Sequence, residues 1–169
     1  AAEVFKNEPS VLKGCGVRNF ISYAEIPVNH NETLYSSGVV RGGDISKLLE
    51  IDENLITEEA THSWYQNDKA LHPYDGQTNP NNTGFVDANT IGADGKEIPT
   101  KALNLEGKYS WIKSPRYNGE PMEVGPLATV VVGLAAKNPR ITKIATQFLE
   151  DTGLPLEALF STLGRTAAR

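Results

Sequence analysis

Residues 66–107 lack hydrophobic periodicity, and so long a stretch limits what the chain can fold into. Asn, Asp, Gly, Pro and Thr dominate it, with turn signals at 79–82 and 94–95. A loop of this length is unusual inside a compact domain, and is normally functional, a contact arm or disordered. A chain of 169 residues suits one domain, or one domain with a small annex. We therefore expect a loop-rich N-terminal part and a more regular C-terminal part.

Short strands are predicted within residues 17–56. Residues 17–26 alternate in the manner of a strand that Pro27 ends, and residues 34–41 are a second strand candidate. Gly42-Gly43 predicts a turn, after which residues 46–50 pair back. No helix between these strands is long enough for a parallel crossover, so the expected sheet is antiparallel.

A helix is predicted at residues 57–65, where Thr57 is a plausible N-cap and two glutamates occupy the first turn. Residues 66–107 are interpreted as a long loop, and residues 108–123 as a short strand followed by a turn.

Residues 124–169 predict three helices. Pro126 and Pro139 suit first helical turns, Gly153 ends the second helix, and Pro155 opens the third. The third helix is expected to carry an apolar stripe of Leu156, Leu159, Phe160 and Leu163, exposed together with residues 127–136. The fold class is thus α+β: a small antiparallel sheet with long loops, followed by three helices.

Charge and hydropathy exclude several classes of partner. The net charge is −5 and the basic residues are scattered, which argues against a nucleic-acid partner. No apolar run approaches the roughly 20 residues that a membrane helix needs, so no direct membrane insertion is expected. The N-terminus shows no targeting signal of the basic-then-apolar kind.

Metal ligands are scarce in this chain. Cys15 is the single cysteine, which rules out an internal disulfide and a zinc site of the CxxC type. His30, His62 and His72 form no HxxxH or HxH pair. The sequence therefore predicts no metal-ligating, cofactor-binding or catalytic residue in the chain itself.

Four stretches nevertheless resemble one family, the large subunit of nickel–iron hydrogenases. The most specific runs YSWIKSPRY at 109–117 and continues to EVGPLA at 123–128. The others are HSWY at 62–65 followed by HPYDG at 72–76, LPL at 154–156 with STLGR at 161–165, and the weaker strand pair at 34–43. They occur in the family's order, so the chain is identified as a middle fragment of that subunit, residues 1–169 forming a single segment.

The chain also departs from the family pattern. The two CxxC motifs that supply the family's metal ligands are absent, and Cys15 matches no family ligand. Thr129 stands where members often carry a basic residue, and Asn81-Asn82 replaces an aromatic residue. Residues 85–107 resemble an insertion.

The resemblance implies a parent enzyme that cleaves or forms H₂ heterolytically and passes electrons to an iron–sulfur small subunit. Its centre would hold nickel and iron, the iron carrying carbonyl and cyanide ligands; four soft thiolates suit these metals. The implied partners of this fragment are the remainder of the large subunit and the small subunit, in a periplasmic or membrane-associated complex. The isolated fragment is expected to be inactive and to self-associate.

Four residues are candidates for tuning the surroundings of such a centre, each with an ordinary alternative. Glu123 is either a buried carboxylate in a network or an acid that stabilises a helix dipole. His62 is either a proton relay or, as we favour, a packing residue. Arg116 and Arg165 either pair with carboxylates from elsewhere in the subunit or lie on the surface. Two further hypotheses remain: a hydrogenase-derived protein-binding module, and a structural paralogue without catalytic activity.

Overall fold

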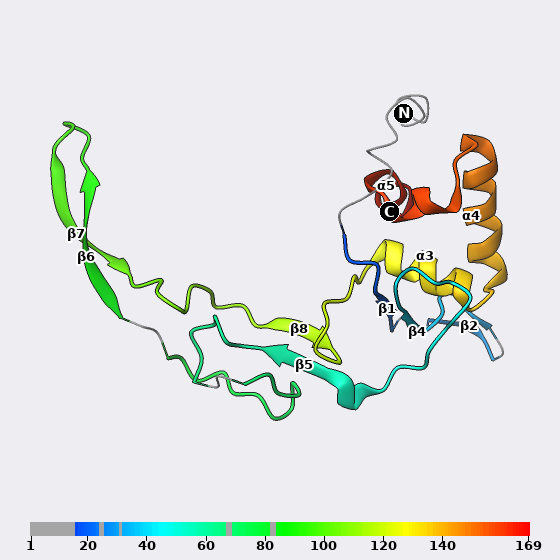
Figure 1. Cartoon of the computed structure of the whole chain (residues 1–169), viewed down its shortest axis with the longest axis horizontal. Helices are drawn as coiled ribbons and strands as arrows, with labels where there is room; N and C mark the ends of the chain where they lie inside the picture. The colour runs from blue at the N-terminus through cyan, green and yellow to red at the C-terminus, as the bar shows by residue number, and fades with distance from the viewer. Residues whose placement is uncertain (1–15, 24–25, 31, 67–68, 82–83) are drawn as a thin grey trace. The chain divides into compact units, whose positions relative to one another are not determined.

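The computed structural model describes residues 16–23, 26–30, 32–66, 69–81 and 84–169 (Figure 1). Cys15 lies outside these residues, as do Asn31 and Asn82. The chain divides into two compact units, one made of residues 1–52 with 121–169 and the other of residues 53–120. Each unit is described by itself below.

The first unit contains two short strand pairs. β1 (Phe20–Ser22) pairs antiparallel with β4 (Gly38–Val40), and Phe20 stands opposite Val40. β2 (Pro27–Asn29) pairs antiparallel with β3 (Glu32–Thr33). The predicted turn and return are confirmed, because Gly42 has a φ of 61° and Leu49 bridges Val39 through backbone hydrogen bonds of 2.9 and 3.0 Å.

Three α-helices follow in this unit, as predicted. α3 (Pro126–Ala135) and α4 (Pro139–Thr152) both begin at a proline, whose fixed φ suits the first helical position. The Asn138 side chain caps α4 by accepting hydrogen bonds from Arg140 N (3.1 Å) and Ile141 N (3.3 Å). Gly153 ends α4 in the left-handed conformation, at φ 62°.

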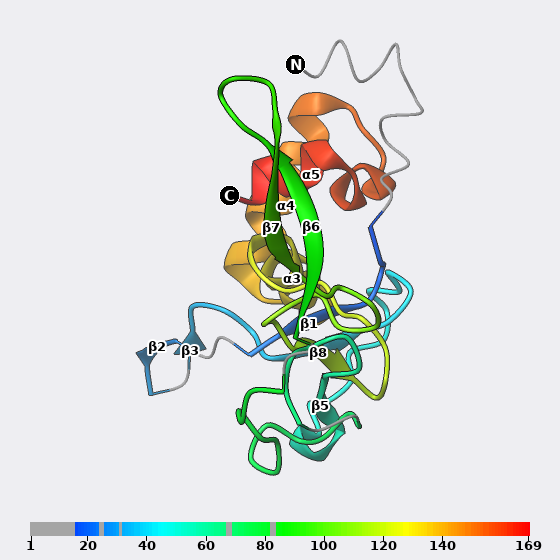
Figure 2. The ribbon, with the colours of Figure 1, turned by 90° about the vertical axis from the view of Figure 1, so that its left-hand side faces the viewer.

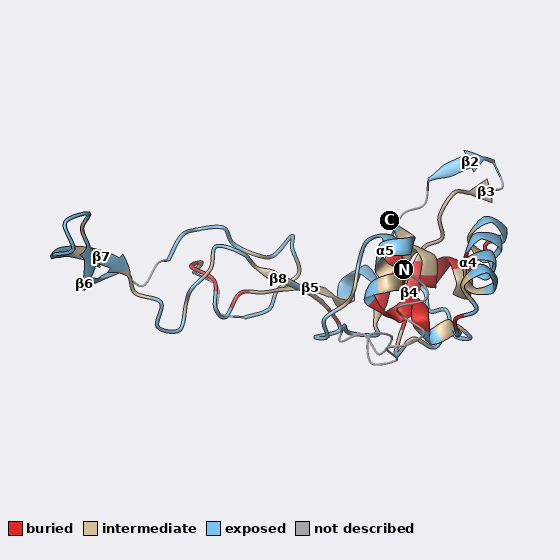
Figure 3. Ribbon diagram, turned by 90° about the horizontal axis from the view of Figure 1, so that it is seen from above, coloured by how far each residue is buried: buried red, intermediate tan, exposed pale blue. Residues whose placement is uncertain are grey.

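The core of the first unit lies between the β1–β4 pair and α3. Figure 3 shows the buried residues gathered there. Phe20 stacks on Phe160 with ring centroids 5.7 Å apart. The buried cluster consists of Phe20, Val40, Leu127, Ala128, Val131, Val132, Leu159 and Phe160.

The third helix differs from the prediction. A 3₁₀ helix, η2 (Leu156–Phe160), is followed by a break at Ser161 and then by α5 (Thr162–Ala168). Ser161 caps α5, since its Oγ accepts from Gly164 N at 3.3 Å. Leu159 and Phe160 lie in the core, so the prediction that both are exposed is wrong. The prediction that residues 127–136 are exposed is also wrong for Leu127, Val131 and Val132, which are buried. Within the residues described, no helix is long and apolar enough to cross a membrane.

In the second unit, the prediction of a helix at residues 57–65 is wrong. η1 (Glu53–Leu55) leads into a strand, β5 (Ile56–Glu59), which pairs antiparallel with β8 (Ser114–Tyr117). Ile56 stands opposite Tyr117, a favourable cross-strand pair. Pairing with a distant strand outweighs the local helix signal here.

The prediction of an unbroken loop at 66–107 is also wrong in part. β6 (Phe85–Ile91) and β7 (Glu97–Leu103), each seven residues long, form an antiparallel hairpin (Figure 2). Its turn lies at the predicted Asp94-Gly95 signal, where Gly95 has a φ of 77°. The sequence did not predict this hairpin, because most of its side chains are exposed and its strands therefore show no alternation of apolar and polar residues. The expected small antiparallel sheet therefore exists as separate two-stranded pairs among the described residues.

Candidate functional site

Glu123 and Arg165 form a two-point ion pair in the first unit. Arg165 Nε donates to Glu123 Oε1 at 2.7 Å, and Arg165 Nη2 donates to Oε2 at 2.5 Å. The third guanidinium nitrogen, Nη1, donates to the Phe160 carbonyl at 2.5 Å. The Arg165 side chain is 24% exposed and the Glu123 side chain 18%, so water screens the attraction between their charges only weakly. The partner of Arg165 is thus a carboxylate of this chain, and neither sequence alternative described it.

The backbone of Glu123 is held by strand β1. Its N–H donates to Asn19 O at 2.7 Å, and its carbonyl accepts from Ile21 N at 3.1 Å. The backbone at Gly16 passes close to the Arg165 guanidinium. A Cβ at this position would lie only 2.3 Å from Arg165 Nη2, so the close approach requires glycine while the guanidinium holds this position. The ion pair therefore connects α5 to β1 and to the residues just before it. The first turn of α3 contains no acidic residue, which places Glu123 before the helix itself.

His62 lies in the second unit and joins two of the sequence motifs. Its ring stacks on Tyr109 with centroids 5.1 Å apart, and its Nδ1–H donates to Gly107 O at 2.8 Å. The His62 carbonyl accepts from Tyr109 N at 3.0 Å. The residue is exposed and lies outside any helix, and its ring holds the loop at Gly107. The choice between a proton relay and a packing residue stays a prediction.

The HSWY and YSWIK motifs pack on each other along their length. Trp64 meets Trp111 edge to face at 5.0 Å. Ser63 Oγ donates to Ile112 O at 2.5 Å, and Tyr65 OH donates to Trp111 O at 3.0 Å. The two motifs therefore form one structural unit, although these partners lie 46 or more positions apart in the sequence.

Two lysines that the sequence analysis did not single out stabilise the joined motifs. Lys113 Nζ lies 3.2 Å from Glu58 Oε2 and 5.3 Å from the Tyr65 ring centroid, with its side chain only 9% exposed. Lys108 Nζ donates to the carbonyls of Ser63 and Tyr65, both at 3.0 Å. Nothing local marks these lysines, because their partners are distant in sequence.

Arg116 lies on β8, half-buried, and its Nη1 donates to Pro115 O at 2.9 Å. Glu59 lies on the neighbouring strand β5 and has a lowered pKa. The main cause is that the Thr61 hydroxyl, and then the Thr61 backbone N–H, donate hydrogen bonds to its carboxylate. The positive charge of Arg116 contributes less.

Of the four candidates, the structure joins Glu123 to Arg165, while His62 and Arg116 belong to the second unit.

The donor set of a nickel–iron centre is not found in the described part of the chain. No three His, Cys, Asp or Glu side chains lie close enough there to hold a metal ion. These residues do not fit such a centre, since nickel and low-spin iron favour thiolates. The described contacts are those of a framework: an ion pair, stacked rings and backbone hydrogen bonds.

The arrangement of strands and helices matches solved hydrogenases. A [NiFeSe]-hydrogenase from Dm. baculatum aligns at a TM-score of 0.65 and 25% identity, covering 99% of this chain and 31% of its own. The [NiFeSe] hydrogenase of D. vulgaris Hildenborough, at 24% identity, also aligns at 0.65 and agrees in fold. The fold is thus part of the hydrogenase large-subunit fold, which confirms the predicted fold class.

The sequence leads to the same class. The family model for nickel-dependent hydrogenase matches residues 1–169. The quinone-reactive Ni/Fe-hydrogenase large chain of Wolinella succinogenes is 69% identical over 100% of this chain and 29% of its own length. The uptake hydrogenase large subunit of Bradyrhizobium diazoefficiens is 40% identical over 92% of this chain and 27% of its own.

This chain belongs to the nickel-dependent hydrogenase family. It spans less than a third of the length of the curated relatives it matches, and corresponds to a fragment of the large subunit.

Proposed function

We propose that the protein containing this chain is the large subunit of a [NiFe] hydrogenase, which cleaves H₂ heterolytically and reversibly and passes electrons to an iron–sulfur small subunit. The observation that carries the proposal is the family match over all 169 residues. The 69% identity to a quinone-reactive Ni/Fe-hydrogenase large chain supports it.

The proposed role of this segment is to support the active-site subunit without holding its metals. The nickel and iron, with carbonyl and cyanide on the iron, would be bound by residues outside the chain. The joined motifs and the Glu123–Arg165 pair support a framework role, since both connect segments distant in sequence. Glu123, Arg165, His62 and Arg116 would act through the shape of that framework.

The proposed setting is a periplasmic or membrane-associated complex. Its support is the similarity to the Wolinella relative, which is named as a quinone-reactive enzyme. Quinones dissolve in membranes, so an enzyme that reduces them works at a membrane surface.

The second candidate is a hydrogenase-derived structural or protein-binding module without catalytic activity. The observation that favours it is the single cysteine, Cys15, where the implied centre needs four thiolates.

A chimera separates the two candidates. The matching segment of the Wolinella large chain is replaced by these 169 residues, which align over 100% of their length. If the proposal holds, the chimera incorporates nickel and reduces a viologen dye with H₂ at a rate close to that of the parent enzyme. A chimera that folds and pairs with the small subunit but shows no H₂-dependent dye reduction would favour the non-catalytic module.

A further inference from the structure

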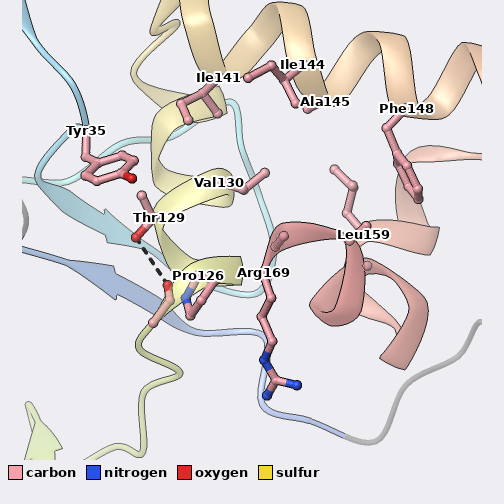
Figure 4. Close-up of a pocket in the computed structure, with 14 residues that line it drawn as sticks. Tyr35, Pro126, Thr129, Val130, Ile141, Ile144, Ala145, Phe148, Leu159 and Arg169 are labelled. Atoms are coloured by element: carbon pink, nitrogen blue, oxygen red, sulfur yellow. Dashed lines mark hydrogen bonds between the residues drawn. The ribbon is translucent and has the colours of Figure 1, made fainter.

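An apolar groove lies open among α3, α4 and the C-terminal α5. Its volume is about 620 Å³. In Figure 4, Phe148 of α4 and Leu159 of η2 point into the same space, while Arg169 carries its guanidinium away from α4. Arg169 is the only charged residue among the described residues that line the groove. A groove so lined accepts an apolar occupant rather than a charged one.

Helix α4 supplies an apolar stripe that the described part of the chain covers only in part. Ile141, Ile144, Ala145 and Phe148 follow the i, i+3, i+4, i+7 spacing of one helix face. Only Ala145 of α4 is buried, and Ile144 is 68% exposed.

The stripe contacts α3 at one end. Ile141 packs against α3, where a Cβ at Gly133 would lie only 2.8 Å from Ile141 Cγ2. All four residues of the stripe also line the groove. From Ile141 to Phe148 the stripe runs about 10 Å, which is two turns of helix. A second helix lying along it can insert side chains at the same spacing.

We infer that this groove receives an amphipathic helix from another part of the same large subunit, anchored by large aliphatic side chains against Ile144 and Phe148. The inference rests on the proposed function, because it places the chain within a longer subunit. Relatives of this chain are more than three times its length, since it covers 29% of the Wolinella large chain. A helix tethered in the same polypeptide has a high effective concentration at the groove, and so it outcompetes a second copy of the chain.

Site-specific photocross-linking in the Wolinella chimera tests the inference. A benzophenone amino acid replaces Ile144 in one chimera and, as the matched control, Thr146 in the other. Thr146 is also exposed on α4 but does not line the groove. The expected result is an internal cross-link from position 144 to a large-subunit peptide outside the 169-residue segment, with little or none from position 146. A cross-link from 144 to a second copy or to the small subunit, or none in a folded chimera, overturns the inference.

A chimera that does not assemble would count against the proposed function but would not test the groove. A second measurement therefore tests the groove without the chimera. Overlapping peptides from the rest of the Wolinella large chain are titrated onto the isolated 169-residue chain by calorimetry. One helical, apolar peptide should bind, and Ile144→Asp should weaken it at least about tenfold, as the loss of one buried isoleucine implies. Thr146→Asp should leave binding unchanged. If no peptide binds, or if both substitutions act alike, the groove is not the docking site.

Discussion

The Glu123–Arg165 pair differs from the Glu32–Arg140 ion pair of the first unit in its access to water. Arg140 Nε lies 3.0 Å from Glu32 Oε1, yet those side chains are 50% and 37% exposed. Glu123 and Arg165 make two hydrogen bonds at similar or shorter distances with less than half that exposure. Removing one partner of a shielded pair leaves the other without the charge that offsets its lost hydration.

Arg165→Met should therefore destabilise the chain by about 1–3 kcal/mol, the cost of leaving a half-buried charge and its hydrogen bonds unmet. The matched substitution Arg140→Met should cost at most about 1 kcal/mol, as exposed pairs do. Urea denaturation followed by tryptophan fluorescence or circular dichroism measures both. Equal midpoints for the two variants would contradict the structural role given to Glu123 and Arg165.

Thr61 should control the ionisation of Glu59. Its hydroxyl and its N–H both donate to Glu59 Oε1, the N–H at 2.9 Å, and they hold the pKa of Glu59 below its ordinary value. Thr61→Val removes the hydroxyl and should raise the pKa of Glu59, whereas Thr61→Ser should keep it low. Carbon-detected NMR titration of the Glu59 carboxyl measures the shift.

The direction of the pH effect on stability follows from the lowered pKa. A carboxyl whose pKa is lower in the folded state stabilises the fold above its unfolded-state pKa, and the stabilisation is lost as pH falls through the folded-state value. Thr61→Val should thus lose stability at neutral pH and differ less from the wild type in acid. A pKa of Glu59 that is the same in all three proteins would disprove the assignment.

Among the elements, the β6–β7 hairpin depends least on packing. Phe85 is 63% exposed, Ile91 65% and Ile98 49%. An isolated two-stranded ribbon is marginally stable in water. Helix α4, by contrast, has an Asn138 cap and contacts α3 through Ile141. The two elements should therefore open with very different free energies.

Limited trypsin digestion should cut first within residues 79–101, at Lys96 or Lys101. Lys143 on α4 is also exposed, but the helix must unwind locally before trypsin can cleave there. Mass spectrometry of early fragments gives the order of cleavage. First cleavage within residues 141–149 would reverse the order of stability inferred for the hairpin and the helix.

For the chain as a whole, the open groove predicts self-association when no other part of a subunit is present. Ile144 left in water forgoes roughly 1.5–3 kcal/mol of burial, and neighbouring apolar side chains add to this. The isolated chain should form a dimer or larger assembly through residues 127–169, and Ile144→Asp should shift it towards the monomer. Thr146→Asp is the control, and size-exclusion chromatography with light scattering is the measurement.

A wild-type chain that stays monomeric at high concentration would contradict this prediction. Phe160→Asp is unsuitable for the test, although the sequence pattern favours it. Phe160 is only 6% exposed and stacks on Phe20, so a carboxylate there should unfold the chain rather than dissociate it.

The sequence by itself determined the family and the ends of α3 and α4, because these depend on contiguous residues. YSWIKSPRY, Pro126, Pro139 and Gly153 can each be interpreted within a few positions of the chain. Proline and glycine act through their own backbone geometry, which tertiary contacts rarely override.

Only the tertiary structure decided which distant residues meet. The pairing of β5 with β8 turned a predicted helix into a strand, and Phe160 lies in the core instead of on the predicted surface. Arg165 and Glu123 are 42 residues apart, and no local spacing relates them. Hydrogen bonding and burial between segments are decided by the folded arrangement, since their free energy arises only when both segments are in place.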